Sequence, residues 1–231
     1  MFSGVFLAMT ARELADHLPK KAAYMACHFS PYSTGLSNTP RQLPENSILL
    51  VDDSIPIQGH NPEIIVEQLQ EILERFSINA VILDFQRELT QKAEQMVTSI
   101  SQALSCPVAV TEPYAVSSNC PVFLSSPPAN KSLINYLKPW LNREIYLEIA
   151  PQTWQITVTE TGSCMQMIDS ADNLPLEDSN LHCHYKVQVL PDQAIFTLQR
   201  TKKDLAALAD QAYQLGVRSV VGLYQELCKL Q

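Results

Sequence analysis

Acidic and hydroxyl side chains recur where short apolar runs of the chain end. The apolar runs at residues 47–51, 80–85, 107–111, 121–124 and 144–149 end in or next to Asp52, Asp53, Asp84, Glu112, Ser125 and Glu148. Short runs of this kind are typical of strands that are buried on both faces of a parallel sheet. Because the carboxyl ends of parallel strands meet at one edge, these acids are candidates for a single site.

Two carboxylates that face each other at such an edge suit the chemistry of glycoside hydrolysis. One acid protonates the leaving oxygen, and a second group stabilises the cationic sugar. The sequence contains no G-x-G-x-x-G or G-x-x-x-x-G-K-[ST] motif and only six glycines, which argues against a nucleotide-binding loop. It also contains no G-x-S-x-G motif, which would carry a nucleophilic serine. The alternative for any single acid is that it caps a helix or lies solvated at a strand end.

The six cysteines are scattered along the chain without a C-x-x-C pair. This spacing favours reduced, mostly buried thiols over a disulfide framework or a zinc site. The one cluster with ligand character is His182-Cys183-His184. Its two histidines would share one face of a strand, but without a third ligand they predict an ordinary polar face. We therefore expect no metal and no cofactor.

Two amphipathic segments flank the central apolar run. Residues 61–76 begin with Asn-Pro, and both this segment and residues 90–104 carry apolar side chains three and four positions apart. This spacing predicts two helices. A helix that connects two buried strands is the unit of a parallel α/β fold.

Nine candidate strands are centred, in chain order, on Val5, Ala23, Leu49, Val81, Val108, Val122, Tyr146, Ile195 and Val220. Eight strands make a TIM-like (β/α)8 barrel, so one candidate is in excess. We favour this α/β barrel, with some short or missing helices, over an open doubly wound sheet. The reason is that acids recur at the strand ends, where barrel enzymes place their sites. Residues 1–231 are expected to form a single domain.

Residues 153–190 differ from the rest of the chain because apolar and polar side chains alternate. The alternation turns at Thr161-Gly162-Ser163 and predicts an antiparallel hairpin that is half open to water. We interpret this stretch as an insertion in the barrel and not as a second domain. Residues 194–199 are expected to resume the barrel as a buried parallel strand.

The formal net charge of −8 and the pI near 5.1 argue against a nucleic-acid surface, since no run of Lys or Arg exceeds two residues. No apolar run approaches the roughly 18 to 20 residues that cross a bilayer. The N-terminal apolar run, residues 4–9, has no basic region before it and no small-residue cleavage site, so it predicts a first strand instead of a signal peptide. These features predict a cytoplasmic protein that binds neither nucleic acid nor membrane.

Residues 79–86, N-A-V-I-L-D-F-Q, resemble the D-x-x-D-x-D-x-E strand of the chitinase-type glycoside hydrolases of family 18. The resemblance covers about the middle third of the chain and implies an eight-stranded α/β barrel. In that family the N-acetyl group of the substrate attacks the anomeric carbon, the last Glu acts as acid and the preceding Asp orients the acetamide. Asp84 matches that Asp, whereas Asn79, Ile82 and Gln86 replace the other three acids.

Gln86 stands in the position of the proton-donating Glu, and an amide cannot donate a proton as a carboxylic acid does. The resemblance therefore implies a degenerate member in which the usual hydrolysis is disabled. A shifted acid, Glu88, would face the same side of an extended strand, but residues 87–90 are more typical of a turn into the following helix.

The hypothesis that these features favour is a non-catalytic barrel whose mouth binds a glycan or another small polar ligand. Its ligand-binding residues would be Asp52, Asp53, Asp84, Gln86, Glu112 and Glu148, with Tyr32 and Tyr114 as stacking platforms in loops past the strands. A second hypothesis is an active glycoside hydrolase that uses Glu112 as acid with Asp84 or Asp53 as partner. A third is an intracellular scaffold protein in which apolar residues of 153–190 form a homodimer or partner interface.

Overall fold

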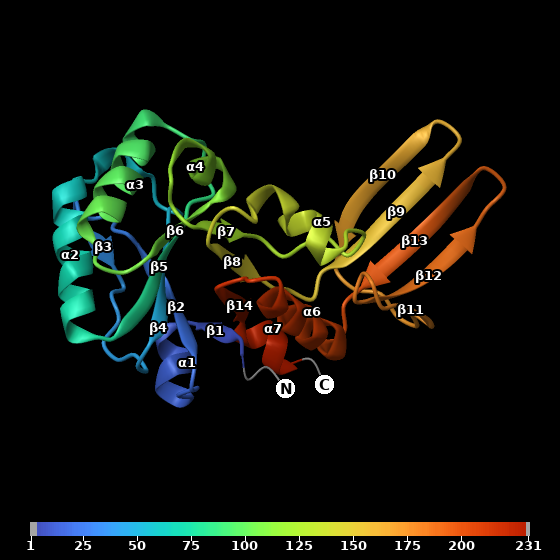
Figure 1. The fold of residues 1–231 in the computed structure, drawn as a ribbon, viewed down its shortest axis with the longest axis horizontal. Coiled ribbons are helices and arrows are strands. Elements are labelled where there is room, and N and C mark those ends of the chain that lie inside the picture. Colours follow the sequence, from blue (N-terminus) through green and yellow to red (C-terminus); the bar gives the residue numbers. More distant parts are fainter. Residues whose placement is uncertain (1–3, 230–231) are drawn as a thin grey trace.

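The computed structural model describes residues 4–229 and contains a closed barrel of eight parallel strands. In order around the barrel the strands are β1 (Phe6–Met9), β2 (Ala22–Phe29), β4 (Ser47–Asp52), β5 (Ile78–Asp84), β6 (Val108–Thr111), β7 (Val122–Leu124), β8 (Ile145–Glu148) and β14 (Ser219–Leu223). The barrel is closed because β1 pairs with both β2 and β14 (Figure 1). The predicted TIM-like α/β barrel is confirmed, and the open sheet is excluded.

Alternation along the barrel strands decides which side chains point inward. One cluster of buried residues fills the interior, and it consists of Phe6, Ala8, Ala23, Ile48, Leu50, Ala80, Ile82, Ala109, Phe123, Tyr146 and Val221. The last inward positions of β4, β5 and β8 lie two residues past Leu50, Ile82 and Tyr146, and they are occupied by Asp52, Asp84 and Glu148. The packing of the interior therefore directs three acids toward the same end of the barrel.

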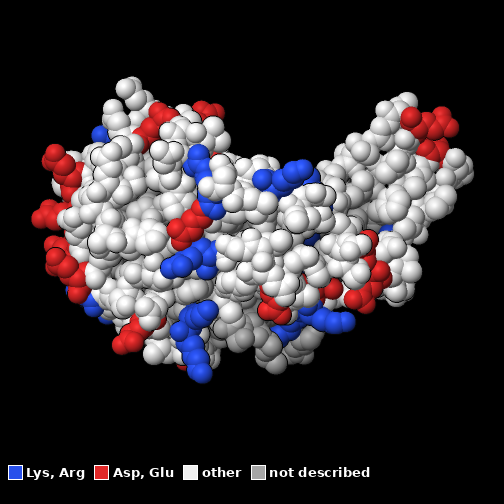
Figure 2. Space-filling model, in the orientation of Figure 1, with Lys and Arg blue, Asp and Glu red and all other residues white. Residues whose placement is uncertain are grey.

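Seven α-helices accompany the strands in the described part of the chain. They are α1 (Ala11–Asp16), α2 (Pro62–Arg75), α3 (Gln91–Ala103), α4 (Glu112–Ser117), α5 (Leu133–Leu137), α6 (Lys202–Gln214) and α7 (Tyr224–Lys229). The two predicted central helices are confirmed as α2 and α3, whose first turns are capped by the side chains of Asn61 and Thr90. They pack side by side on the outside of the barrel, and acidic side chains line the edge that α2 forms (Figure 1, Figure 2).

The described segment between β2 and β4 contains no helix. Its only regular element is β3 (Leu36–Ser37), which pairs antiparallel with the end of β2. A helix normally follows each strand of such a barrel, so the outer layer is incomplete at this point. The expectation of short or missing helices is confirmed here and at α1, α4, α5 and α7, each of which has six residues or fewer. No helix within residues 4–229 is long and apolar enough to span a membrane.

A second, five-stranded antiparallel sheet comes after β8 and projects to one side of the barrel (Figure 1). Its strands are β9 (Thr153–Thr159), β10 (Gly162–Ile168), β11 (Leu176–Asp178), β12 (Cys183–Val189) and β13 (Gln193–Gln199), in the spatial order β10-β9-β13-β12-β11. The predicted hairpin is confirmed as β9 and β10, which turn between Thr159 and Gly162.

The expectation that residues 194–199 resume the barrel is wrong, because β13 pairs antiparallel with β9 and β12. This removes Ile195 from the nine predicted strand centres and leaves the eight of the barrel. The residues of β13 are mostly half-buried, whereas the barrel strands are almost fully buried. In its second half Phe196 and Leu198 alternate with Thr197 and Gln199, which is the pattern of a sheet with one exposed face.

Arg200, directly after β13, joins the sheet to the barrel. Its side chain is buried, and its guanidinium donates hydrogen bonds to the carbonyl oxygens of Pro127, Pro128 and Leu181. Pro127 and Pro128 lie just past β7 of the barrel, and Leu181 precedes β12 of the sheet. Burial lowers the pKa of Arg200 to about 10, so the side chain stays charged at neutral pH.

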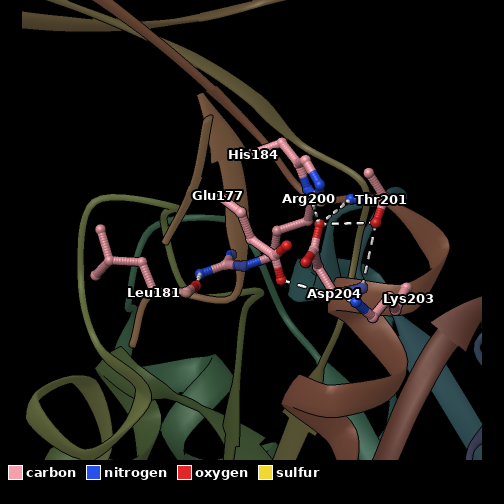
Figure 3. Close-up of polar contacts among 7 residues, drawn as sticks. All are labelled: Glu177, Leu181, His184, Arg200, Thr201, Lys203 and Asp204. Atoms are coloured by element: carbon pink, nitrogen blue, oxygen red, sulfur yellow. Dashed lines mark hydrogen bonds and ion pairs between the residues drawn. The ribbon is translucent and has the colours of Figure 1, made fainter. Parts of the chain in front are cut away.

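Asp204 holds the first turn of α6 against the same sheet (Figure 3). Its Oδ2 accepts hydrogen bonds from the backbone N–H of Thr201 at 2.8 Å, from the Thr201 hydroxyl at 2.7 Å and from His184 Nδ1 at 2.8 Å. Burial works to raise the pKa of Asp204, but the bonds from Thr201 and His184 outweigh it and hold the pKa below its usual value. The helix cap and a residue of β12 thus share one carboxylate.

Replacing Arg200 by Ala should destabilise the protein by at least about 3 kcal/mol, because one buried and two partly buried carbonyl oxygens lose a charged donor. Urea unfolding of the two proteins measures this difference. Lys186→Ala is the matched control, since Lys186 lies on β12 but is exposed and makes one hydrogen bond to the carbonyl of Asp172. Equal effects of the two substitutions would contradict the role of Arg200.

Candidate ligand site at the barrel mouth

A cavity of about 110 Å³ lies inside the barrel at the carboxyl ends of its strands. Its polar lining consists of Asp52, Asp84 and Glu148, one from each of β4, β5 and β8. Apolar residues complete the wall, including Met25, Leu50 and Phe123. Three of the predicted site residues therefore converge on one cavity.

Gln86 is not one of the residues that line this cavity, but it contacts Asp84, which is. Its Nε2 donates a hydrogen bond to Asp84 Oδ1 at 2.5 Å. Asp84 is half-buried, and Gln86, two residues further along the chain, is exposed. One oxygen of this cavity carboxylate is therefore paired with the amide of an exposed residue.

Asp53 has a different role from its neighbour Asp52. It is buried, and its two carboxylate oxygens accept the backbone N–H groups of Gln86 at 2.8 Å and Arg87 at 3.1 Å. The Arg87 Nε in turn donates to the Asp53 carbonyl at 2.7 Å. Asp53 thus fixes the loop that carries Gln86, and its oxygens are not directed at a ligand. Period-two alternation is the sequence signal for this difference, since adjacent strand residues point to opposite faces.

Two of the carboxylates that line the cavity, those of Asp84 and Glu148, hold their protons more tightly than exposed acids do. Burial raises the pKa of Asp84, and the negative charges of Asp52 and Asp53 raise it further, against the hydrogen bond from Gln86. Burial also raises the pKa of Glu148, opposed by the backbone N–H of Ser126 at 3.4 Å and reinforced by the charges of Asp84 and Glu226. Buried acids that repel one another are common at functional sites.

Glu226 belongs to this group of acids but does not stand out in the sequence. It lies in the first turn of α7, directly after the last barrel strand, and its Oε2 is buried without a hydrogen-bond partner among the described residues. Burial raises its pKa. Its position just past a barrel strand is the only sequence signal that could have found it.

Glu112 lies at the rim and does not line the cavity. It is the first residue of α4 and is exposed. The nearby Tyr136 hydroxyl donates to the Ser125 carbonyl at 2.9 Å. Burial raises the pKa of Tyr136, and the charges of Glu112 and Glu148 raise it further, so both acids are close to this tyrosine.

The two predicted stacking residues differ in exposure. Tyr32, in the loop after β2, is 95% exposed and open to a ligand. Tyr114 is 1% exposed, because residues 112–117 form α4 and not a loop, and its ring packs edge-on against Phe85 at 5.6 Å. Burial raises its pKa to about 12. Tyr114 is part of the core outside the barrel, and the prediction that it stacks on a ligand is wrong.

The two histidines of the 182–184 cluster contact different partners. His182 Nε2 lies 3.2 Å from Gln211 Oε1, and His184 Nδ1 bonds Asp204. Within residues 4–229 no group of three or more His, Cys, Asp or Glu side chains is arranged to hold a metal ion.

In comparison with solved structures, the fold is similar to the α/β barrels of chitinases and related glycoside hydrolases, some of which are described as members of family 18. An N-acetylglucosaminidase of that family from Paenibacillus barengoltzii superposes with a TM-score of 0.56 and 10% identity, over 97% of this chain and 98% of that one. A family 18 chitinase variant from Cycas revoluta, in complex with (GlcNAc)4, gives 0.53 and 8%, over 95% and 94%. A chitinase from Chromobacterium violaceum gives 0.52 and 10%, over 95% and 93%.

No protein-family model and no curated protein sequence matches the chain. At identities of 8–10% the likeness to the three enzymes is one of fold. It confirms the barrel that the resemblance of residues 79–86 implied.

Glu148→Gln should raise the free energy of unfolding at neutral pH. The pKa of Glu148 is raised in the folded protein, so folding favours the protonated form of this side chain. The resulting stabilisation is fully present below the ordinary glutamate pKa of about 4.3. It is lost as the pH rises through the raised pKa of Glu148 in the folded protein. Gln keeps an acceptor for the Ser126 N–H but cannot ionise. We expect a gain of about 0.5–3 kcal/mol at neutral pH that disappears near pH 4.

Urea unfolding of both proteins across this pH range measures the difference. The exposed acid Glu88, changed to Gln, is the control for the loss of one charge. Parallel stability profiles for the parent protein and Glu148→Gln would contradict the proposed burial of this carboxylate.

Proposed function

We propose that the mouth of this barrel binds a glycan without hydrolysing it by the mechanism of family 18. The observation that carries the proposal is the hydrogen bond from Gln86 Nε2 to Asp84 Oδ1 at the carboxyl end of β5. An aspartate and a polar side chain two residues later keep the spacing of the family's Asp-x-Glu pair. The second member is an amide, which does not donate a proton to a leaving oxygen.

The surroundings of Asp84 also differ from those of a catalytic pair. Ile82, the preceding inward residue of β5, is fully buried in the apolar interior. The family's second Asp would occupy this position and support the charge of the third. Asp84 instead has an apolar residue beneath it and an amide beside it, which suits an acceptor of hydrogen bonds from a ligand.

The size of the cavity supports a ligand that enters only in part. A volume of about 110 Å³ is well below the roughly 300–1,000 Å³ of pockets that enclose a whole small molecule. It accommodates one polar substituent, such as an acetamido group, against Asp52, Asp84 and Glu148. The remainder of a sugar chain would lie across the rim, where Glu112 and the exposed ring of Tyr32 are available.

The Cycas revoluta chitinase supports this proposal by analogy. It was solved with one glutamate replaced by glutamine, one glycine replaced by tryptophan, and (GlcNAc)4 present. A barrel of this fold therefore accommodates an oligosaccharide when a glutamate has become an amide. Amino-sugar oligomers are accordingly the first ligands to test on this chain.

The outer part of the antiparallel sheet favours a second role, assembly with another copy of the chain. Paired residues place a cross-strand row of apolar side chains on one face, namely Met165, Ile156, Phe196 and Val187. Met165, Met167, Val187 and Val189 of the sheet are 39–79% exposed. A large apolar face open to water is typical of an interface. Light scattering that shows a monomer at micromolar concentration would remove the support for this role.

The active-hydrolase alternative finds less support. Asp53 is occupied by the backbone of residues 86 and 87, and Glu112 does not line the cavity of Asp84. Glu112 is therefore not arranged as a carboxylate pair with either of its proposed partners, Asp84 or Asp53, around a shared site.

Titration calorimetry with (GlcNAc)4 tests glycan binding directly. We expect a dissociation constant in the micromolar to millimolar range and a loss of about tenfold or more in Asp84→Ala, because the ligand loses a charged acceptor. Glu67→Ala, an exposed acid on α2, should bind like the parent protein. Absence of heat for amino-sugar and neutral oligosaccharides alike, with a folded protein, would sink the proposal.

Gln86→Glu should create a pair of carboxylates that shares one proton near neutral pH. Burial already raises the pKa of Asp84, and a second carboxylate in hydrogen-bonding contact would raise the pKa of one member further. We expect at most feeble hydrolysis of an N-acetylglucosaminide, because Ile82 still replaces the family's second Asp. Side-chain carbon shifts followed by NMR across the pH range measure the titration. Two ordinary carboxylate titrations would defeat this prediction.

A further inference from the structure

The incomplete outer layer between β2 and β4 leaves a hollow of about 1,000 Å³ on the outside of the barrel. Its floor includes Tyr24 and Ala26 of β2, which alternate with inward residues and so face away from the barrel interior. Its walls come from α1, from the segment after β3 and from the last turn of α2. This pocket, which we call the β2 pocket, is separate from the mouth cavity and shares no lining residue with it.

Every charged side chain that lines the β2 pocket is an arginine. The lining contains Arg12, Arg41 and Arg75, and it contains no Asp, Glu or Lys among the described residues. The whole chain, by contrast, has 24 acidic and 16 basic residues. The charge of this pocket is therefore opposite in sign to the net charge of the protein. A pocket lined only by positive charges favours an anionic ligand.

The arginines of the β2 pocket also differ from the other arginines of the chain in their hydrogen-bond partners. The sequence has seven arginines, all within the described residues, and four of them donate to the protein itself. Arg87, Arg143 and Arg200 bond backbone carbonyls, and Arg218 pairs with Glu144. The remaining three make no hydrogen bond or ion pair with any described residue, and these three are the arginines of the β2 pocket. Their N–H donors are therefore available to a ligand.

Local contacts hold the arginine-bearing segments in place without using those donors. The Tyr24 hydroxyl bonds the Asn38 carbonyl at 2.6 Å, and Gln42 Nε2 donates to the Leu14 carbonyl at 3.4 Å. These bonds tie the segment of Arg41 to β2 and to α1. The guanidinium carbon of Arg75 lies 5.1 Å from the centre of the Phe76 ring, a stacking contact that leaves its N–H groups uncommitted.

Arg41 is also close enough to the floor to influence it. Burial raises the pKa of Tyr24, the negative charge that Cys27 can carry adds to this rise, and the positive charge of Arg41 opposes it. The guanidinium of Arg41 therefore acts across the pocket and not only on the solvent outside it.

We propose that the β2 pocket binds a small molecule that carries two or more oxyanion groups, either phosphoryl or carboxyl. Guanidinium groups match such oxyanions through paired N–H donors, and three of them from three segments suit more than one anionic group. A volume of about 1,000 Å³ is at the upper end of the usual range for ligand pockets and exceeds the need of a single phosphate ion. This site does not depend on the proposed function of the barrel mouth.

Titration calorimetry with tripolyphosphate and with citrate tests the proposal at low ionic strength. We expect at least one of the two anions to bind, with an affinity that falls as salt is added. Binding of tripolyphosphate alone would identify a phosphoryl ligand, and binding of citrate alone a carboxyl ligand. The Asp84→Ala variant should bind these anions unchanged, which separates this site from the mouth.

The triple variant Arg12→Gln, Arg41→Gln and Arg75→Gln should weaken anion binding by about tenfold or more. The control is Lys92→Gln, Lys131→Gln and Lys138→Gln, which removes the same charge from residues outside the pocket and should retain binding. Each single Arg→Gln variant is also measured, so that a triple variant that fails to fold does not decide the question. Equal losses in the two triple variants, or no binding of either anion at millimolar concentration, would overturn the proposal.

Discussion

Closure of the barrel is the constraint on which the rest of the structure depends. Once eight parallel strands pair in a ring, every second residue of each strand points inward, and the interior accepts only apolar side chains until the strand ends. Asp52, Asp84 and Glu148 occupy the first inward positions that the apolar packing does not require. The mouth is thus a direct product of strand register, and the acids converge because the strands are parallel and in step.

The same constraint divides neighbouring acids between two tasks. Asp52 faces the cavity, while Asp53 points away from it and holds the loop of Gln86 by two backbone hydrogen bonds. Holding several buried acids together costs stability at neutral pH, as the raised pKa values of Asp84 and Glu148 indicate. A cost of this kind is common where a site is retained for function. The amide of Gln86 in place of a second acid supports the proposal that this arrangement binds a ligand without hydrolysing it.

Local periodicity made much of the barrel predictable from the sequence. Buried runs, their terminal acids and the helices α2 and α3 all carry a clear pattern, and these patterns together indicate the barrel. Residues 194–199 were misassigned because a strand of seven residues with mixed burial resembles a short buried strand when its partners are unknown. Tyr114 was misplaced because a six-residue helix is too short to leave a periodic signal. The arginines of the β2 pocket lie far apart in sequence, at positions 12, 41 and 75, so only the folded chain brings them together.

The points where the chain enters and leaves the antiparallel sheet have a consequence for how the sequence of the sheet could evolve. Thr153, where the chain leaves the barrel, is paired directly with Gln199, where it returns, and Arg200 fastens that point to the carbonyls after β7. Residues 153–199 therefore begin and end at neighbouring positions, so the barrel can accommodate them as it would a short loop. Residues added to or removed from the far tips of β9, β10, β12 and β13 change the reach of the sheet with only a slowly varying entropic effect on closure. The sheet can thus be lengthened, trimmed or resurfaced independently of the barrel, which makes it the part of this chain most open to acquiring a new partner.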